Sequence, residues 1–464
     1  MLKFCIEHAK RNENGKLEFL WVNGLPTKDS EDYFALLEDW RRSGEAKSFT
    51  FFDNDNIQKY LENCNVRQTF NEFPNQVTDL LHDNKFSSIA SIVPLSEIPI
   101  GQRYIYPIFL YSPRYLQLPI FLEKGIFLSE RVKQDCREGL CKLLIWDVLE
   151  GQGWNTFNYW PGGKSIKKFI QAQHRIHNIP LENIGFADCN FKTPELQNTF
   201  GSKGFFYPTY EHQISFRFNN KHDFPILDRI EALTRNNKKP YYFLSLNRRP
   251  HNHRIMLGQK IFDRWMDKFL WSLSKFTDIV RNAATNPWAD IVEKTISKDF
   301  YDFLPAQLDV VFRNEFFHID TEVGYNIPTQ LLDKTYINLV TETKFFESDA
   351  LFLSEKIFKP ISYLQPFIVV GPVNELKTLK SLGYQTFHPF IDESYDSIED
   401  PIERFNAIMS EVDRICSLTH EDMQDLVKKC IPSLLHNYFL RKKVKKEFIR
   451  EINFVSQLND WLHV

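Results

Sequence analysis

The stretch Phe352-Leu-Ser-Glu-Lys-Ile-Phe-Lys-Pro-Ile361, followed by Pro366-Phe-Ile-Val-Val-Gly371, has the pattern of a helix that leads into a buried strand. Ser354, Glu355 and Lys356 form a short polar turn before the helical pattern, and the strand ends at a glycine. A helix N-terminus offers unpaired N–H groups and the positive end of a dipole, both of which favour phosphate groups. The stretch therefore predicts an α/β sheet whose edge presents a carboxylate and a lysine to a nucleotide diphosphate.

Strand and helix patterns alternate on both sides of this stretch. In the C-terminal half, strands are expected at residues 241–246, 336–342, 366–371 and 384–387, and helices at 355–361, 374–382 and 402–418. In the N-terminal half, a nearly continuous apolar run at 143–149 precedes a helical pattern at 164–177 and a strand at 184–188. This order is typical of βαβ units with a parallel sheet. We predict two Rossmann-like α/β domains that face a cleft, with a helical C-terminal tail.

A chain of 464 residues is too long for one ordinary core and indicates two domains of roughly 200 residues each. The polar run Asn236-Asn-Lys-Lys-Pro240 is the best match to a link between them. We place the N-terminal domain at residues 1–236, the C-terminal domain at 237–435 and the helical tail at 436–464.

Composition narrows the class of protein. A formal net charge of −3 argues against a nucleic-acid-binding protein, which normally carries a basic excess. The first residues are charged and lack the apolar core of a signal peptide, and no run approaches the roughly 18 apolar residues of a membrane span. The seven cysteines show no paired spacing, as expected of reduced thiols. These features predict a cytoplasmic protein.

The strand Tyr336-Ile-Asn-Leu-Val-Thr-Glu-Thr343 brings Glu342 to the same sheet edge as the turn at residues 354–356. Together they resemble the donor-site signature of the α1,3/4-fucosyltransferase family, in which a strand ending in Glu-Asn-Ser precedes a Tyr-Val-Thr-Glu-Lys turn. Phe352 stands where that family has a tyrosine. The resemblance covers residues 240–395 and implies a GT-B fold. It further implies an N-terminal domain for a glycan or glycolipid acceptor, and a C-terminal domain for a GDP-sugar donor. Transfer would be inverting, without a metal or a further cofactor.

By resemblance, Glu355 would hold ribose hydroxyls and Lys356 a phosphate oxygen. The basic loop after residues 241–246 adds cations, of which Arg254 is the best match to the family's phosphate-binding arginine. Two alternatives stay open: the loop is an exposed basic surface, or Glu355 and Lys359 form an ordinary helix-face ion pair of about 0.5 kcal/mol. The predicted donor-binding residues are Asn247, Arg248, Arg249, Arg254, Glu342, Ser354, Glu355, Lys356 and Lys359.

The catalytic base is expected on a loop of the N-terminal domain. Asp147-Val-Leu-Glu-Gly-Gln-Gly153 ends a buried strand with carboxylates and two glycines, so that an acceptor can approach closely. Glu150 is our candidate base, while Asp147 could instead hold the turn. Trp154, Tyr159 and Trp160 follow in the same loop and would either stack on an acceptor sugar or pack a domain interface.

Two other functions stay open at this point. The chain could be a non-catalytic nucleotide- or carbohydrate-binding protein on a degenerate GT-B scaffold, or a metal-dependent GT-A transferase that uses Asp53 and Asp55. The basic segment at residues 438–449 has one apolar face. It would form a peripheral contact with an anionic membrane or, in the interpretation we prefer, pack on the N-terminal domain.

Overall fold

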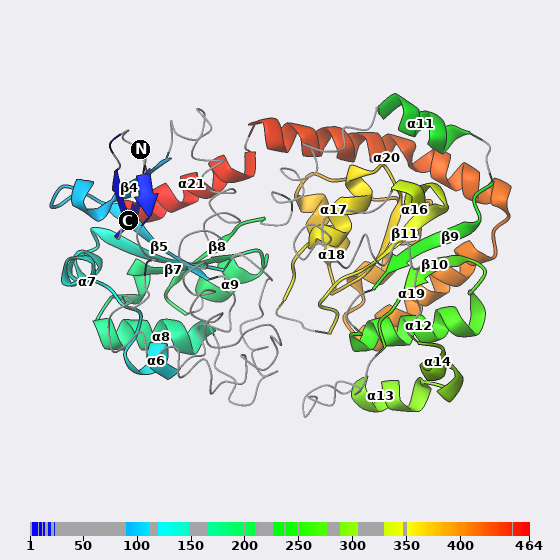
Figure 1. Ribbon diagram of the computed structural model, residues 1–464, viewed down its shortest axis with the longest axis horizontal. Helices are drawn as coiled ribbons and strands as arrows, with labels where there is room; N and C mark the ends of the chain where they lie inside the picture. The colour runs from blue at the N-terminus through cyan, green and yellow to red at the C-terminus, as the bar shows by residue number, and fades with distance from the viewer. Residues whose placement is uncertain are drawn as a thin grey trace. The chain divides into compact units, whose positions relative to one another are not determined.

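The computed structural model describes residues 2–7, 9–11, 13, 17–19, 23, 90–110, 119–147, 166–198, 200–208, 211, 226–235, 238–247, 250–275, 288–304, 329–346, 350–447 and 449–464. The chain divides into two compact units, each with its own parallel sheet (Figure 1). The first unit comprises Met1–Phe157, Gly162–Thr209 and Phe448–Val464, and the second comprises Asn158–Pro161 and Tyr210–Glu447.

The described residues of the first unit form a six-stranded sheet in the order β4-β1-β5-β6-β7-β8. Neighbouring strands in this sheet are parallel. The strands are β1 (Leu2–Ile6), β4 (Ala90–Pro94), β5 (Tyr104–Leu110), β6 (Cys141–Asp147), β7 (Ile184–Asp188) and β8 (Lys203–Phe206). A separate antiparallel pair is formed by β2 (Ala9–Arg11) and β3 (Leu17–Phe19).

Side chains alternate along β6 because successive residues of a strand point to opposite faces. Leu143 and Ile145 enter the core that also holds Val132 and Phe169, and so face α7 and α8. The other face of the sheet packs on α21, where the rings of Trp146 and Phe454 lie 4.8 Å apart. The helices of this unit are α6 (Pro119–Glu123), α7 (Glu130–Arg137), α8 (Ile166–His177), α9 (Thr193–Asn198) and α21 (Ile449–Leu462).

Helix α21 is remote in sequence from the sheet that it covers. Trp461 lies 5.2 Å from Phe205 between ring centroids, and its indole N–H donates to the carbonyl of Glu182 at 2.9 Å. Residues 449–462 therefore pack on the first unit. The basic segment preferred above to pack on the N-terminal domain lies elsewhere, because its residues 438–447 belong to α20 (His420–Glu447) of the second unit. None of the described helices combines the length and the apolar composition that a membrane span needs.

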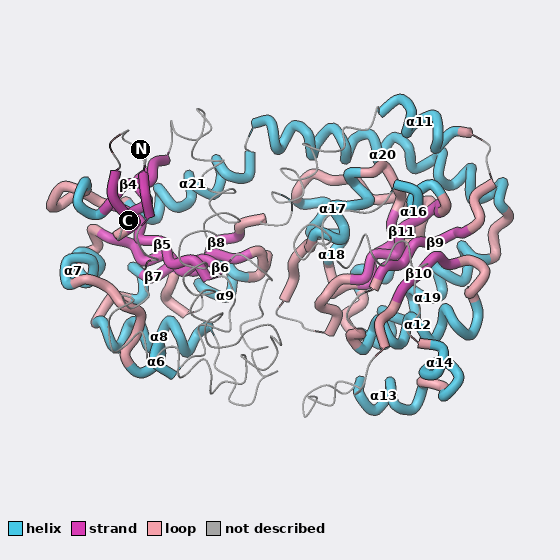
Figure 2. Tube along the Cα trace, viewed as in Figure 1, coloured by secondary structure: helices cyan, strands magenta, loops and turns pink. Residues whose placement is uncertain are grey.

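The described residues of the second unit form a four-stranded parallel sheet in the order β10-β9-β11-β12. Helices surround it, as Figure 2 shows. The strands are β9 (Tyr241–Leu246), β10 (Phe269–Ser272), β11 (Thr335–Thr341) and β12 (Phe367–Val370). The helices are α11 (Ile226–Thr234), α12 (Asn252–Arg264), α13 (Trp288–Thr295), α14 (Lys298–Phe303), α16 (Thr329–Asp333), α17 (Glu355–Ser362), α18 (Glu375–Ser381), α19 (Pro401–Cys416) and α20 (His420–Glu447).

Capping residues explain where two of these helices begin. The Ser354 hydroxyl accepts a hydrogen bond from the Lys356 N–H and starts α17. The Asp400 carboxylate accepts from the N–H groups of Ile402 and Glu403 and starts α19, with Pro401 in its first turn. Both are N-cap interactions of the usual kind.

The predicted fold class is confirmed as an α/β protein with two parallel sheets and C-terminal helices. The strands at 184–188 and 241–246 have the predicted bounds, whereas the short strands β1, β8 and β10 were not anticipated. The strand predicted at 384–387 is wrong. There the N–H groups of Gln385 and Phe387 donate to the side chains of Asn437 and Glu393 instead of to a neighbouring strand.

The compact units divide the chain differently from the predicted boundaries. Glu211 and α11, which precede the predicted boundary at residue 236, belong to the second unit. The tail expected at 436–464 is divided as well, because α20 belongs to the second unit and α21 to the first.

Gly185 of β7 tests how tightly α21 is packed. A Cβ at this position would lie 2.6 Å from the Trp461 ring and 3.0 Å from Phe205. We expect Gly185→Ala to lower the free energy of unfolding by about 1–3 kcal/mol, the usual cost of overpacking. The measurement is urea denaturation of the full chain, followed by far-ultraviolet circular dichroism.

The double variant with Trp461→Ala provides the control for this substitution. Removing the indole opens the space that the new methyl group needs, so the added cost of Gly185→Ala should largely disappear in that background. An equal cost in both backgrounds would show that the indole does not limit the space at Gly185.

Candidate functional site

Two polar residues and a glycine follow three neighbouring strands of the second unit where these strands end. Asn247 comes directly after β9, Glu342 after β11 and Gly371 after β12. The N–H of Glu342 donates to the carbonyl of Val370 at 3.0 Å, which carries the sheet pairing one residue beyond β11. Because the strands are parallel, these residues share one edge, the carboxyl edge, where α/β sheets bind ligands.

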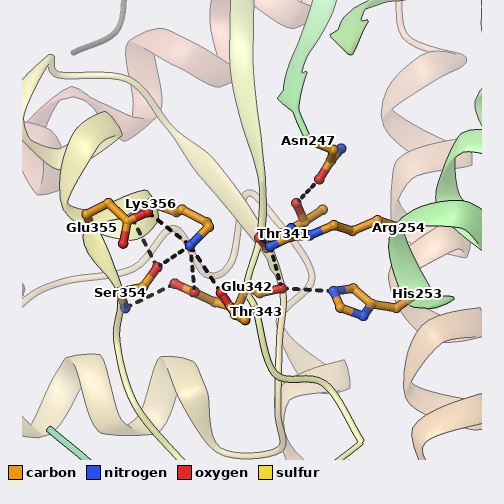
Figure 3. A network of polar contacts seen from close by, with 9 residues as sticks. All are labelled: Asn247, His253, Arg254, Thr341, Glu342, Thr343, Ser354, Glu355 and Lys356. Atoms are coloured by element: carbon orange, nitrogen blue, oxygen red, sulfur yellow. Dashed lines mark hydrogen bonds and ion pairs between the residues drawn. The ribbon is translucent and has the colours of Figure 1, made fainter. Parts of the chain in front are cut away.

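Lys356 is the centre of the polar network at this edge (Figure 3). Its ammonium donates to Glu355 Oε1 at 3.0 Å, to the Ser354 hydroxyl at 3.1 Å and to the Thr343 hydroxyl at 3.3 Å. It also lies 3.9 Å from Glu342 Oε2. The two residues after β11 and the first turn of α17 are thus held together through one charged group.

The start of α17 is fixed against the end of β11 by a second contact. Glu342 Oε1 accepts the N–H of Ser354 at 3.2 Å, while the Ser354 hydroxyl caps the helix. The predicted strand and turn residues, Glu342 and Ser354 to Lys356, therefore meet at one place. Lys356 keeps 26% of its side chain exposed, which leaves room for a ligand to reach it.

The ion pair of Glu355 is made with Lys356 and not along the helix face. Among the described ion pairs, none joins Glu355 to Lys359, so the alternative of an ordinary i, i+4 pair is not realised. Burial acts to raise the pKa of Glu355, but Lys356 and Lys359 outweigh it, and its pKa lies below the usual value. Glu355 is therefore an ionised acceptor of hydrogen bonds at neutral pH.

The pKa values of the two lysines shift in opposite directions, although burial acts to lower both. Burial acts to lower the pKa of Lys356, but the carboxylates of Glu355 and Glu342 outweigh it and raise the pKa. Around Lys359 the same carboxylates do not outweigh burial, and its pKa falls to about 8. Lys356 is therefore a permanent cation at neutral pH, whereas Lys359 titrates close to it.

Helix α12 reaches the same edge through its first turn. Arg254 Nη2 donates to the carbonyls of Thr341 and Glu342, each at 3.0 Å, and a ring nitrogen of His253 lies 2.8 Å from the Glu342 carbonyl. Burial, together with the nearby Arg254, lowers the pKa of His253 well below its usual value, so the ring is neutral. Arg254, expected at donor phosphates, is buried and uses part of its donor capacity to hold the end of β11.

Asn247 joins this edge to β9. Its side-chain carbonyl accepts a hydrogen bond from the Thr341 hydroxyl, and its amide donates to the Ser245 hydroxyl at 3.2 Å. Thr341 and Thr343, which flank Glu342 in sequence, were not among the predicted donor-binding residues. Their position beside a predicted strand-end carboxylate was the signal available for finding them.

Glu375 is a site residue that the sequence analysis missed. It is the first residue of α18, only 1% exposed, and neither carboxylate oxygen has a hydrogen-bond partner among the described residues. Its Oε2 occupies the space of a side chain at Gly371, since a Cβ there would lie 1.5 Å away. Burial, and next the charge of Glu342, raises the pKa of Glu375 well above its usual value. A carboxyl group that favours its protonated form therefore lies near the ionic network.

Several predicted site residues lie outside the described residues. They are Arg248 and Arg249, the candidate base Glu150, the aromatic residues Trp154, Tyr159 and Trp160, and the pair Asp53 and Asp55. In the part of the chain that is described, no group of three or more His, Cys, Asp or Glu side chains is placed to hold a metal ion.

The described edge combines three kinds of group. Lys356 and Lys359 supply positive charge, the ionised Glu355 accepts hydrogen bonds, and the N-terminus of α17 adds the positive end of its dipole. Together these groups can bind a phosphate and a hydroxyl-bearing ring side by side.

Comparisons with known proteins give little beyond this geometry. No protein family model matches the chain, and no curated protein matches its sequence. Among solved structures, the chain is similar to the N-terminal domain of trehalose-6-phosphate phosphatase from Candida albicans. The two are 9% identical, with 76% of this chain and 71% of that chain covered and a TM-score of 0.36. Similarity at this level carries no argument about activity.

Glu375→Gln tests the protonated state of the buried carboxyl group. A pKa that is raised in the folded protein contributes stability below the unfolded value of about 4.3, and this stability is lost as the pH rises toward the folded pKa. We therefore expect the free energy of unfolding of Glu375→Gln, relative to the unmodified protein, to increase between pH 5 and pH 8. The increase has a limiting slope of about 1.4 kcal/mol per pH unit.

The measurement is urea denaturation at several pH values. Glu403→Gln, on an exposed position of α19, serves as the matched control and should keep the pH dependence of the unmodified protein. A stability difference for Glu375→Gln that does not change with pH would contradict a raised pKa.

Proposed function

We propose that the chain is a glycosyltransferase of GT-B type that moves a sugar from a nucleotide-diphosphate donor to a glycan or glycolipid acceptor. The proposal extends the resemblance to the α1,3/4-fucosyltransferase family, so a GDP-sugar such as GDP-fucose is the favoured donor. Transfer is metal-independent and inverting. The observation that carries the proposal is the network of Lys356, Glu355 and Glu342 at the carboxyl edge of the second sheet.

The leaving group of such a reaction is a nucleoside diphosphate, and its developing negative charge must be stabilised. In the absence of a metal, cationic side chains and a helix N-terminus have to supply the positive field. Lys356 is held at the start of α17 by three hydrogen bonds, so its ammonium is already oriented. Pre-organised charge of this kind stabilises a transition state without reorganisation.

Glu355 suits the ribose of the donor. Its carboxylate stays ionised and partly exposed, with 18% of the side chain accessible. A carboxylate accepts hydrogen bonds from two adjacent hydroxyls. Lys356 and Glu355 are neighbours, so phosphate and ribose would be bound by the same helix turn.

The acceptor side of the proposal rests on sequence alone. Glu150 is proposed as the base that removes the proton of the acceptor hydroxyl, and Trp154, Tyr159 and Trp160 are proposed to stack on the acceptor sugar. The enzyme would act in the cytoplasm. There its basic segment at residues 438–449 would contact an anionic membrane that carries a lipid-linked acceptor.

Lys356→Met tests the donor site, because methionine keeps the length of the side chain and removes the charge. Thermal shifts with GDP, UDP, ADP, CMP and dTDP should identify one nucleotide that stabilises the unmodified protein by about 2.7 kcal/mol at a hundred times its dissociation constant. We expect Lys356→Met to weaken the binding of that nucleotide at least about tenfold, which is equivalent to ~1.4 kcal/mol.

Lys377→Met, on an exposed position of α18, is the matched control and should bind the nucleotide unchanged. If no nucleotide stabilises the protein, the donor-site proposal fails. If one binds at Lys356 but no sugar is transferred to any acceptor, a non-catalytic binding protein is the better description.

Nucleotide affinity should also depend on pH through Lys359. Its pKa of about 8 means that the ammonium loses its charge as the pH rises through that value. We expect the affinity for the nucleoside diphosphate to fall about tenfold between pH 7 and pH 9, the loss of one charge-assisted hydrogen bond. Calorimetric titration at each pH measures this change.

Lys359→Arg separates this effect from other titrations. Arginine stays charged throughout the range, so its nucleotide affinity should be nearly constant from pH 7 to pH 9. An equal decline in both proteins would show that Lys359 does not contact the diphosphate.

A further inference from the structure

A cavity of about 700 Å³ lies in the first unit, away from the carboxyl edge of its sheet. Gly139, Lys142, Asn183 and Lys203 line it, and each lies at or next to the start of β6, β7 or β8. The cavity therefore opens at the amino edge of the sheet. Its volume is within the range of roughly 300–1,000 Å³ that small-molecule sites occupy.

Four cationic side chains line the cavity: those of Arg103, Arg137, Lys142 and Lys203. Among the ion pairs of the described residues, none includes any of the four. Arg103 donates one guanidinium N–H to the carbonyl of Leu462 at 2.8 Å, and Arg137 donates one to the carbonyl of His177 at 2.9 Å. The remaining N–H groups of these two side chains are available to an anion.

Lys142 is the most informative of the four. Its side chain is 4% exposed, and its ammonium donates to Asn183 Oδ1 at 2.7 Å and lies 5.7 Å from the centre of the Trp461 ring. Burial, and next the charge of Arg103, lowers its pKa. The charge of Glu182 opposes this shift, but Glu182 forms no described ion pair with Lys142. A buried ammonium that lacks a paired carboxylate is costly, and a bound anion would offset that cost.

The walls of the cavity are held in place before any ligand arrives. Asn183 donates through Nδ2 to the carbonyl of Cys136 at 2.8 Å, which fixes the oxygen that Lys142 uses. Trp461 is anchored by its hydrogen bond to the Glu182 carbonyl. Pre-organisation of this kind reduces the cost of ordering a site on binding.

Carboxylates at the same cavity narrow the class of ligand. Glu138, Glu182 and Asp460 line it as well, and all three are exposed. Three carboxylates disfavour a polyanion, and they are good acceptors for hydroxyl groups. A ligand with one phosphate and several hydroxyls satisfies both sets of groups.

We propose that this cavity binds a small phosphorylated sugar. Its phosphate lies against Lys142, Arg137 and Lys203, and its hydroxyls face Glu182 and Asp460. The site is separate from the carboxyl edge of the second unit, and the proposal does not depend on the transferase activity. Because Trp461 belongs to α21, an occupied cavity also strengthens the attachment of that helix to the sheet.

Isothermal titration of the full chain with glucose 6-phosphate, inorganic phosphate and glucose tests the proposal. We expect saturable binding of glucose 6-phosphate, weaker binding of inorganic phosphate and no binding of glucose. Lys142→Met and Lys203→Gln should each reduce the affinity for glucose 6-phosphate about tenfold or more, as expected when a hydrogen bond to a charged group is lost. Lys203 is exposed, so its variant tests the site even if Lys142→Met alters folding.

Lys167→Met, on an exposed position of α8, is the matched control and should bind as the unmodified protein does. The absence of binding at millimolar glucose 6-phosphate would overturn the proposal, and so would unchanged affinity in both cavity variants. Binding that is lost in Lys356→Met but kept in Lys142→Met would place the ligand in the second unit and also overturn it. Equal affinity for inorganic phosphate and the ester would overturn the assignment of a sugar.

Discussion

Glu342 joins three segments of the second unit at one point. Its N–H pairs with β12, its carbonyl accepts from His253 and Arg254 of α12, and its carboxylate accepts from the N–H of Ser354. The residue is 1% exposed, so these bonds form where water does not compete. Glu342 therefore helps to fix both α12 and α17 against the end of β11, together with the contacts of Arg254 to Thr341 and of Lys356 to Thr343.

Burial of so many charged groups at one edge has an electrostatic consequence. Lys356 is stabilised as a cation by two carboxylates, whereas Glu375 is driven toward its neutral form by burial and by Glu342. Strongly shifted pKa values are frequent at functional sites, where burial and charged neighbours tune the groups that act. At the carboxyl edge of the second sheet, Lys359 and Glu375 have shifts of this kind.

In the first unit, the charged groups that line the cavity lie at the amino edge of the sheet. Its cavity lies where β6, β7 and β8 begin, and it is lined by cations that have no described ion pair. Helix α21 closes one side of it through Trp461, although that helix is the last element of the chain. One sheet thus gains a candidate site from a segment more than 250 residues away in sequence.

The sequence by itself determined the class of fold and the turn from Ser354 to Lys356. Apolar strands alternating with amphipathic helices have few solutions other than parallel sheets, and an N-cap serine is a local signal. Only the tertiary structure decided that Arg254 binds backbone carbonyls, that Glu375 is buried with no hydrogen-bond partner among the described residues, and that α21 covers the first sheet. Those outcomes depend on contacts between segments that are distant in sequence. Hydrophobic periodicity indicates which face of a helix or strand is buried, but it does not indicate which segment covers that face.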